Sequence, residues 1–273
     1  VEGFIKTNPI MGDLKFSNVT TDLLSLFPYD YSDAIRGNIF GEVSIGKNLN
    51  PKAFDLNVNL KNGEIANQPF DDFEILTHFS DGILDLQVLK LTYGVDTNFN
   101  IKGQYPIIFD STEYEKVNLK SKFNNINISF FTQFSKIWKD NLFGVFSGQF
   151  NMDGTAKKTT FDIKGKIDNT VYKGVPLGTV KWTGNYRDKT LTFDQFTSDW
   201  VDNHISGSAI LPIVYDLAEI EKTWHSDGEL LVITEGSFSS ALFLSTFLAE
   251  TDSIVGDINI KLNIRGPTNS LIR

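Results

Sequence analysis

The residues best suited to chemistry in this sequence are a few histidines and paired acids. They are His78, His204 and His225, and the acid pairs Asp71 with Asp72 and Asp199 with Asp202. No histidine has a metal-ligand spacing to another histidine or to an acid. The paired acids lie near expected turns, and turn chemistry explains them better than calcium binding or glycoside hydrolysis. The sequence has no glycine-rich phosphate loop, Gly-x-Ser-x-Gly elbow or His-Glu-x-x-His motif. We therefore predict no catalytic residue, metal or cofactor, and a protein that is not an enzyme.

The composition and net charge argue against several kinds of site and partner. The chain has no cysteine, which removes disulfides, thiolate catalysis and cysteine-ligated metals. The formal net charge of −9 argues against nucleic acid and against an anionic membrane surface as the main partner. Hydrophobic residues make up 41% of the sequence, so a core can form.

The length of 273 residues allows one or two domains. No apolar stretch is long enough to cross a bilayer, since the longest, residues 241–249, is about half the required length. The chain starts at Val1 without a signal-peptide pattern and stops in what reads as the middle of a motif. We expect a piece of a longer protein, with any membrane anchor outside it.

An internal repeat organises the sequence. Phe54 and Asp55 recur as Phe161 and Asp162, and many other residues recur at this same distance along the chain, which we call the repeat spacing. Other identical pairs at the repeat spacing are Lys15/Lys122, Phe16/Phe123, Asn18/Asn125, Phe27/Phe134, Asp33/Asp140, Gly37/Gly144, Gly41/Gly148, Asn62/Asn169, Pro69/Pro176, Asp81/Asp188 and Leu84/Leu191. A third copy begins at a slightly longer spacing from the second, with the pairs Phe131/Phe243, Asp140/Asp252, Gly144/Gly256 and Gly154/Gly266. We predict repeat 1 at residues 13–110, repeat 2 at 111–217 and the truncated start of repeat 3 at 218–273.

Strict alternation of apolar and polar residues dominates each copy. In residues 35–45, 142–152 and 254–264, every second position is apolar or glycine. A period of two places these positions on one face of a strand and the polar residues on the other. About six such strands occur per copy, so we predict an all-β fold of antiparallel strands with one apolar face. His78 and His204 fall on the polar face, which favours a solvated surface over a ligand role.

One segment per copy breaks the alternation. Capping residues at 21–22, 129 and 239–240 each precede a cluster of Leu and Phe, which predicts one short amphipathic helix per repeat. We interpret this helix as a plug at one end of the core; a lid over, or a gate into, a groove is the alternative.

A sheet with one apolar face must cover that face. This sequence predicts no long helix to do so. The sheet must close on itself, pack on another sheet or hold an apolar ligand. Because the repeats add strands along one axis, the apolar face should become a long trough.

The order of these motifs resembles the TamB and AsmA-like superfamily. The resemblance rests on the Leu- and Phe-rich segment, the Gly-x-φ-x-Gly-x-φ strand and the strand opening Phe-Asp. It is closest in residues 252–266, in Thr-Leu-Thr-Phe-Asp-Gln-Phe at 190–196 and in His-Ile-Ser-Gly at 204–207. The repeat-ending Gly266 is followed directly by Pro267, whereas the family usually places the proline a few residues later.

The resemblance implies a rolled, open β-taco groove with an apolar interior. It also implies a periplasmic, envelope-spanning protein with an inner-membrane anchor outside this chain, and passive movement of phospholipid or another acyl-chain lipid between the two membranes. TamB itself is linked to outer-membrane protein assembly with a barrel partner, so the resemblance also implies an outer-membrane BamA-like barrel as a partner. The family carries no catalytic residue, and the acidic net charge already argued against nucleic acid.

We expect eleven apolar residues to line the groove as its lipid contacts. They are Phe54, Leu56, Val58, Phe73, Ile75, Leu86, Phe161, Ile163, Trp182, Tyr186 and Phe193. The alternative is that they are ordinary core residues.

Two other functions stay open at this point. The first is a structural or assembly module that binds outer-membrane β-barrel proteins or another partner through exposed strand edges. The second is an enzyme on a jelly-roll or β-helix scaffold, which the lack of a site makes least favoured.

Overall fold

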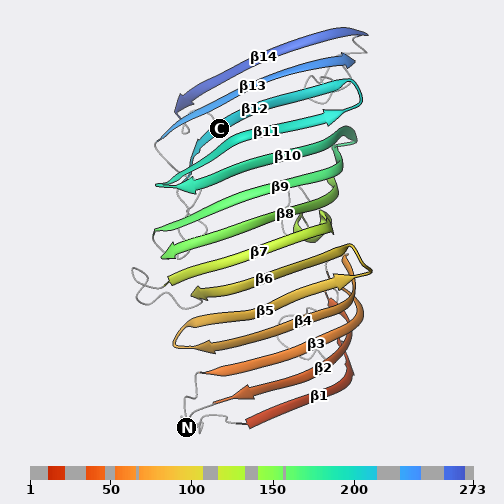
Figure 1. The fold of residues 1–273 in the computed structure, drawn as a ribbon, viewed down its shortest axis with the longest axis vertical. Coiled ribbons are helices and arrows are strands. Elements are labelled where there is room, and N and C mark those ends of the chain that lie inside the picture. The colour runs from red at the N-terminus through yellow and green to blue at the C-terminus, as the bar shows by residue number, and fades with distance from the viewer. Residues whose placement is uncertain are drawn as a thin grey trace, which may run out of the picture.

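The computed structural model is one curved β-sheet with a single short helix among its described residues (Figure 1). It describes residues 12–21, 35–46, 53–65, 68–106, 116–132, 141–155, 158–213, 228–240 and 255–267. In chain order the elements are β1 (Gly12–Thr20), β2 (Ile35–Ile45), β3 (Phe54–Ile65), β4 (Gln68–Ser80), β5 (Ile83–Tyr93), β6 (Thr97–Pro106), β7 (Lys116–Asn127), α1 (Ser129–Thr132), β8 (Leu142–Thr155), β9 (Thr159–Tyr172), β10 (Val175–Arg187), β11 (Thr190–Trp200), β12 (Asn203–Pro212), β13 (Glu229–Ser240) and β14 (Val255–Pro267). The all-β prediction is confirmed.

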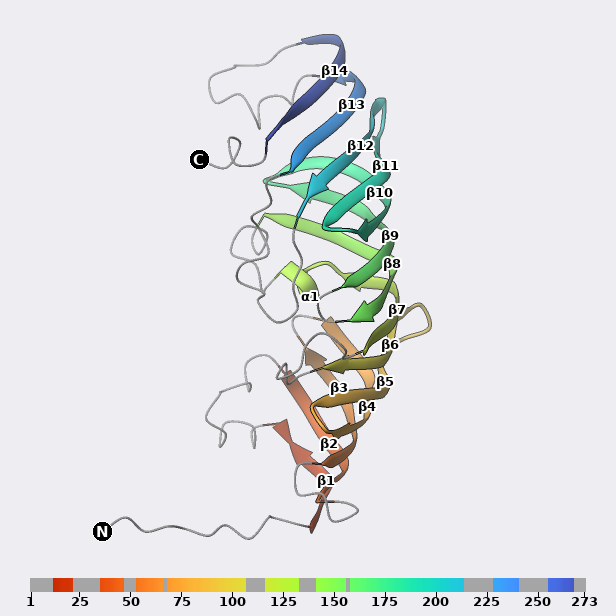
Figure 2. The same cartoon turned by 90° about the vertical axis from the view of Figure 1, so that its left-hand side faces the viewer.

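The sheet has 14 strands in the order of the chain, each antiparallel to the next. The first strand, β1, and the last, β14, lie at opposite ends of the molecule, so the sheet does not close into a barrel. Figure 2 shows the strands curving around a concave side, on which α1 lies. Of the arrangements that the residue pattern left open, the structure shows an open sheet, as the family resemblance implied.

Two-residue hairpins connect matching strands in the two repeats. Asp81 and Gly82 join β4 to β5, and Asp188 and Lys189 join β10 to β11. All four residues have positive φ, at 51°, 81°, 48° and 61°. Two successive positive φ angles define the type I′ turn, whose twist matches that of the paired strands. Asp81-Gly82 is a dipeptide that this turn favours, and the second repeat forms the same turn with Asp188 and Lys189.

The registers of the two repeats shift at equivalent positions. Four register shifts of the first repeat recur in the second repeat at the repeat spacing. The shift between Phe16 and Val19 recurs between Phe123 and Ile126, and the shift between Arg36 and Asn38 recurs between Phe143 and Val145. In the same way, Leu76/Thr77 matches Thr183/Gly184, and Leu86/Leu89 matches Phe193/Phe196. The pairing of β9 with β10 adds two shifts around Gly178 that the pairing of β3 with β4 lacks. Six strands end before residue 110 and six more before residue 217. The exact repeat boundaries stay predictions.

Asparagines with left-handed backbone recur in both repeats. Asn18 and Asn125 have φ of 55° and 50°, and Asn62 and Asn169 have φ of 51° and 54°. Asparagine tolerates this conformation better than most residues with a side chain.

Replacing Asn169 with alanine is expected to lower the free energy of unfolding by about 1 kcal/mol, because Cβ disfavours the left-handed conformation. Asn169→Gly should be nearly neutral, since glycine adopts that backbone freely. Urea unfolding of the two variants beside the parent chain measures both values. Equal stability of the two variants would contradict the explanation.

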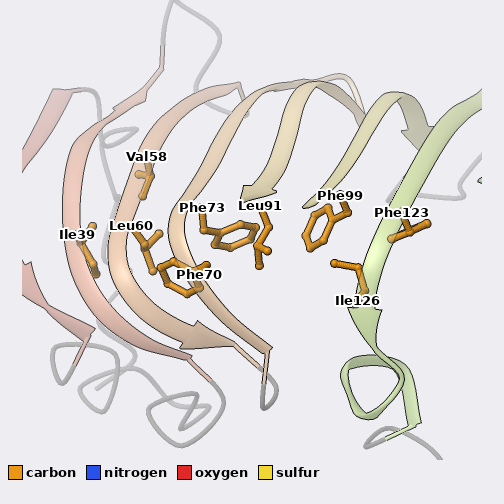
Figure 3. Close-up of a cluster of buried hydrophobic side chains, with 9 residues drawn as sticks. All are labelled: Ile39, Val58, Leu60, Phe70, Phe73, Leu91, Phe99, Phe123 and Ile126. Atoms are coloured by element: carbon orange, nitrogen blue, oxygen red, sulfur yellow. The ribbon is translucent and has the colours of Figure 1, made fainter. Parts of the chain in front are cut away.

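The buried core lies along the concave face in the first half of the sheet (Figure 3). Its members are Ile39, Val58, Leu60, Phe70, Phe73, Leu91, Phe99, Phe123 and Ile126. Aromatic rings form a ladder across neighbouring strands, with centroid distances of 6.1 Å from Phe73 to Phe99 and 5.8 Å from Phe99 to Phe123. Offset and edge-on aromatic contacts of this kind stabilise the core beyond area burial.

The short helix α1 adds two phenylalanines to this core from the concave side. The ring of Phe130 lies 5.5 Å from that of Phe99, and the ring of Phe131 lies 5.3 Å from that of Phe123. One of the three predicted helices is therefore observed, and its Phe130 and Phe131 pack against the core cluster. The other two predicted segments, after residues 21–22 and 239–240, lie outside the described residues. Within the described part of the chain, no helix is long and apolar enough to span a membrane.

Candidate functional site

An unbroken row of residues, one per strand, runs the length of the concave face. Cross-strand partners lie on the same face of a sheet, so the row can be followed through the registers. It consists of Phe16, Gly41, Val58, Ile75, Leu89, Ile101, Ser121, Phe150, Ile163, Gly184, Phe193, Ala209, Val232 and Ile264. Its one polar side chain, Ser121, donates its hydroxyl hydrogen to the carbonyl oxygen of Phe150 at 2.8 Å. We call this set the groove row.

All eleven predicted groove residues lie on the face of the groove row. Val58, Ile75, Ile163 and Phe193 belong to the row itself. Leu56, Leu86, Phe161 and Tyr186 form part of the next row on one side, and Phe73 and Trp182 part of the row on the other. Phe54 stacks on Phe79 beyond Leu56, with ring centroids 5.1 Å apart. The structure therefore places all eleven residues on one face of the sheet. Contact between these residues and lipid stays a prediction.

Burial changes along this face. Val58, Phe73, Leu86 and Tyr186 are buried, whereas the other seven predicted residues are half-buried. The main core cluster draws its buried members from β2 to β7 only. Over β9 to β11 the same face keeps Ile163, Trp182 and Phe193 partly accessible. The apolar face is thus less completely buried over β9 to β11 than over β2 to β7.

Several large aromatic rings lie over glycines of the same face. A Cβ atom at Gly165 would stand 2.6 Å from Cζ2 of Trp182 and 2.9 Å from Cε2 of Phe146. A Cβ atom at Gly207 would stand 2.6 Å from Cζ of Phe196. Glycine leaves room for a neighbouring group to approach the strand closely.

A second aromatic cluster joins Phe150 of the groove row to residues of the next row. Phe161 stacks on Tyr186 with centroids 4.8 Å apart and contacts Phe150 at 5.4 Å. Phe161, Phe150 and Tyr105 pack against buried Val117 and Met152. Burial raises the pKa of the Tyr105 phenol, because the charged phenolate is poorly solvated there. This phenol stays neutral at ordinary pH and adds no charge to the groove.

The opposite face carries the charged groups. Asp55 lies 2.6 Å from Nδ1 of His78, Asp199 lies 2.6 Å from Nδ1 of His204, and Arg187 donates to Asp162 at 2.7 Å. Asp55 and His78, and Asp199 and His204, are partners in the strand register, whereas Asp162 pairs with Asn185 and contacts Arg187 from there. Asp72 and Lys61 are also register partners, and their hydrogen bond holds the pKa of the Asp72 carboxyl below its usual range. Among the residues that the structure describes, no group of three or more His, Asp or Glu is placed to hold a metal.

Asp71, Asp72 and Asp199, three of the acids noted in the sequence, have partners in the structure. Asp71 lies within β4, and its carboxylate accepts a hydrogen bond of 2.7 Å from the backbone N–H of Gly94, in the turn between β5 and β6. Asp199, near the end of β11, lies beside His204. Both carboxylates therefore connect neighbouring parts of the sheet.

A hollow of about 720 Å³ also lies on the polar side of β7 to β11. Its polar lining includes Lys122, Lys164, Lys166 and Lys181, and Lys166 contacts Asp168 at 2.5 Å. Exposed lysines on the polar face of a strand are ordinary surface residues. The candidate functional site is therefore the apolar groove.

No family model, curated protein or solved structure matches this chain.

The sequence interpretation missed several residues that the structure brings to the groove. Ile101, Phe146 and Ile167 line it together with the predicted Ile163 and Trp182. Alternation alone had placed Phe146 on the apolar face, but no local signal identified the strand partners that complete the lining.

Proposed function

We propose that this chain is a segment of an envelope-spanning, TamB/AsmA-like protein that conducts phospholipid between the inner and outer membranes. The observation that carries the proposal is the groove row: thirteen apolar residues or glycines and one serine, continuous across all 14 strands. The motifs in residues 190–196, 204–207 and 252–266 support the family assignment.

The physical benefit of such a row is that it keeps hydrocarbon out of water along a route. Exposing an acyl chain to water costs about 0.8 kcal/mol for each CH₂ group. A continuous apolar face removes much of that cost at every step along the sheet. Because the sheet is open, the polar headgroup can stay in water while the acyl chains contact the groove row.

This proposal places the chain in the periplasm. The inner-membrane anchor would belong to another part of the same protein. A BamA-like barrel in the outer membrane is the partner that the family resemblance implies. The net charge of −9 fits a partner that is not nucleic acid.

A second function is favoured by the ends of the sheet. Among the described strands, β1 and β14 each have a strand neighbour on one side only. An unpaired strand edge is a template on which another protein can add a strand. In this alternative the chain is an assembly module that binds outer-membrane β-barrel proteins by their strands.

Native mass spectrometry distinguishes the two functions. After incubation with vesicles of phosphatidylethanolamine and phosphatidylglycerol, the purified chain should carry phospholipid adducts that resist gentle desalting. Lipid should also pass from donor to acceptor vesicles faster with the chain than without it. A folded chain that gains no lipid adduct, verified by its β-sheet circular dichroism spectrum, would contradict conduction. Strand addition by an outer-membrane protein to such a lipid-free chain would favour the assembly module.

A further inference from the structure

A discrete pocket lies in the groove beside α1. It has a volume of about 540 Å³, within the range of about 300–1,000 Å³ typical of small-molecule sites. Residues of β6 to β10 line it, together with Ile128 and Phe131 at the start of the helical segment. The pocket therefore lies where the second repeat begins.

The lining of this pocket defines the chemistry of its ligand. Ile101, Phe150 and Ile163 come from the groove row, and Phe146 and Trp182 flank them with rings stacked at 5.9 Å. The hydroxyl of Ser121 is engaged with the Phe150 carbonyl oxygen. By strand alternation, Gln149 and Lys164 direct their side chains to the opposite face. A pocket without a free polar side chain favours hydrocarbon, because a buried polar ligand group would lose its hydrogen bonds to water.

Gly165 lets two aromatic rings lie against its strand, at a place where the first repeat has a side chain. The equivalent position in the first repeat, at the repeat spacing, is the buried Val58. At Gly165 the missing side chain is replaced by the rings of Trp182 and Phe146, which would stand 2.6 Å and 2.9 Å from a Cβ atom. A side chain at this position would push both rings toward the pocket.

The helix α1 supplies a wall of the same pocket. The ring of Phe131 contacts Phe123 and Phe146, with centroids 5.3 Å away in each case. The ring of Phe130 contacts Phe99 and packs against the buried core of the first repeat. The pocket thus borders packed core on one side and the more accessible groove of β9 to β11 on the other.

We propose that this pocket is a station in the groove that holds one hydrocarbon chain against Trp182, with its size set by Gly165 and its wall formed by Phe131. The inference rests on the proposed function, because the chain it holds would belong to a lipid moving through the groove. It adds that lipid does not contact the groove uniformly but dwells at the start of the second repeat.

Trp182 provides a direct probe of the pocket. A variant with Trp138→Phe, Trp200→Phe and Trp224→Phe keeps only Trp182, and its counterpart with Trp138→Phe, Trp182→Phe and Trp224→Phe keeps only Trp200. Each is mixed with vesicles of phosphatidylcholine that carry bromine on the acyl chains, which quenches a tryptophan on contact. Trp182 should be quenched several-fold more strongly than Trp200, which lies outside the pocket.

Gly165→Val, which introduces the residue found at the equivalent place in repeat 1, should remove most of the quenching in the Trp182 variant. Gly266→Ala is the matched control, because a Cβ atom there has no neighbour within 4 Å. It should leave the quenching unchanged. Circular dichroism of each variant verifies the fold.

The outcomes separate the station from the proposed function. Equal quenching of Trp182 and Trp200, or undiminished quenching in a folded Gly165→Val variant, would overturn the station while lipid still occupies the groove. If neither tryptophan is quenched and native mass spectrometry finds no lipid adduct, the proposed function itself fails.

Discussion

Replacing Ile163 with aspartate should abolish lipid transfer by this chain while the sheet remains folded. Ile163 belongs to the groove row and lines the pocket of about 540 Å³ beside Trp182. A carboxylate at this point stays hydrated, because moving an isolated charge into an apolar site is very costly. Its bound water would keep roughly four CH₂ groups of a passing acyl chain wet, at a cost of about 3 kcal/mol. That cost corresponds to roughly a hundredfold loss of occupancy.

The fold should survive because Ile163 is half-buried and faces open space. Its strand, β9, is held on both sides by the backbone pairing to β8 and β10. Lys164→Asp is the matched control, since it introduces the same acid one residue away on the polar face. Phe161→Arg should act like Ile163→Asp, because Phe161 lies on the groove face and stacks on Tyr186.

Transfer of labelled phospholipid between donor and acceptor vesicles measures this effect. The Ile163→Asp variant should fall to the rate without protein, and the Lys164→Asp variant should match the parent chain. Unimpaired transfer by a folded Ile163→Asp variant would end the conduit proposal. The residues of the groove row would then be ordinary core residues without a role in lipid transfer.

Replacing Phe99 with alanine should cause the largest loss of stability of any single change proposed for this chain. Phe99 has 2% of its surface exposed, and its ring contacts Phe73, Phe123 and Phe130 at 6.1, 5.8 and 5.5 Å. Removing a buried phenyl group loses its transfer free energy and leaves a cavity, which together cost about 3–5 kcal/mol. Because Phe99 joins the core of the first repeat to α1, both should loosen.

Urea denaturation followed by circular dichroism measures the free energy of unfolding of Phe99→Ala and of a surface control. The control is Val95→Ala, since Val95 is 92% exposed in the turn between β5 and β6 and should change stability by no more than about 0.5 kcal/mol. A loss for Phe99→Ala as small as that of the control would show that the ring ladder does not hold the core.

Alternation and the repeat were sufficient to predict much of the fold from the sequence. A period of two can only be satisfied by strands that separate apolar from polar residues, as in β2 and its counterpart β8. The repeat spacing identified equivalent positions such as Asn62 and Asn169, whose left-handed φ angles the structure shows in both copies.

Alternation within a strand does not predict which residues of neighbouring strands lie opposite each other. Asp55 and His78 are 23 residues apart, and only the register of β3 with β4 places them 2.6 Å apart. Trp182 could be assigned to the apolar face, but its position over Gly165 depends on how β9 pairs with β10. Two groups that meet through a register cannot be matched by any pattern within one strand.

The sequence by itself determined an all-β, repeated chain with one apolar face, because side-chain direction in a strand follows position along the chain. The tertiary structure alone decided that the sheet stays open, that α1 packs over Phe99 and Phe123, and that a pocket remains beside Trp182. These features depend on the curvature of the whole sheet and on which side chains fill the space above it. The curvature and the filling of that space result from contacts among many strands, so no local stretch of sequence encodes them.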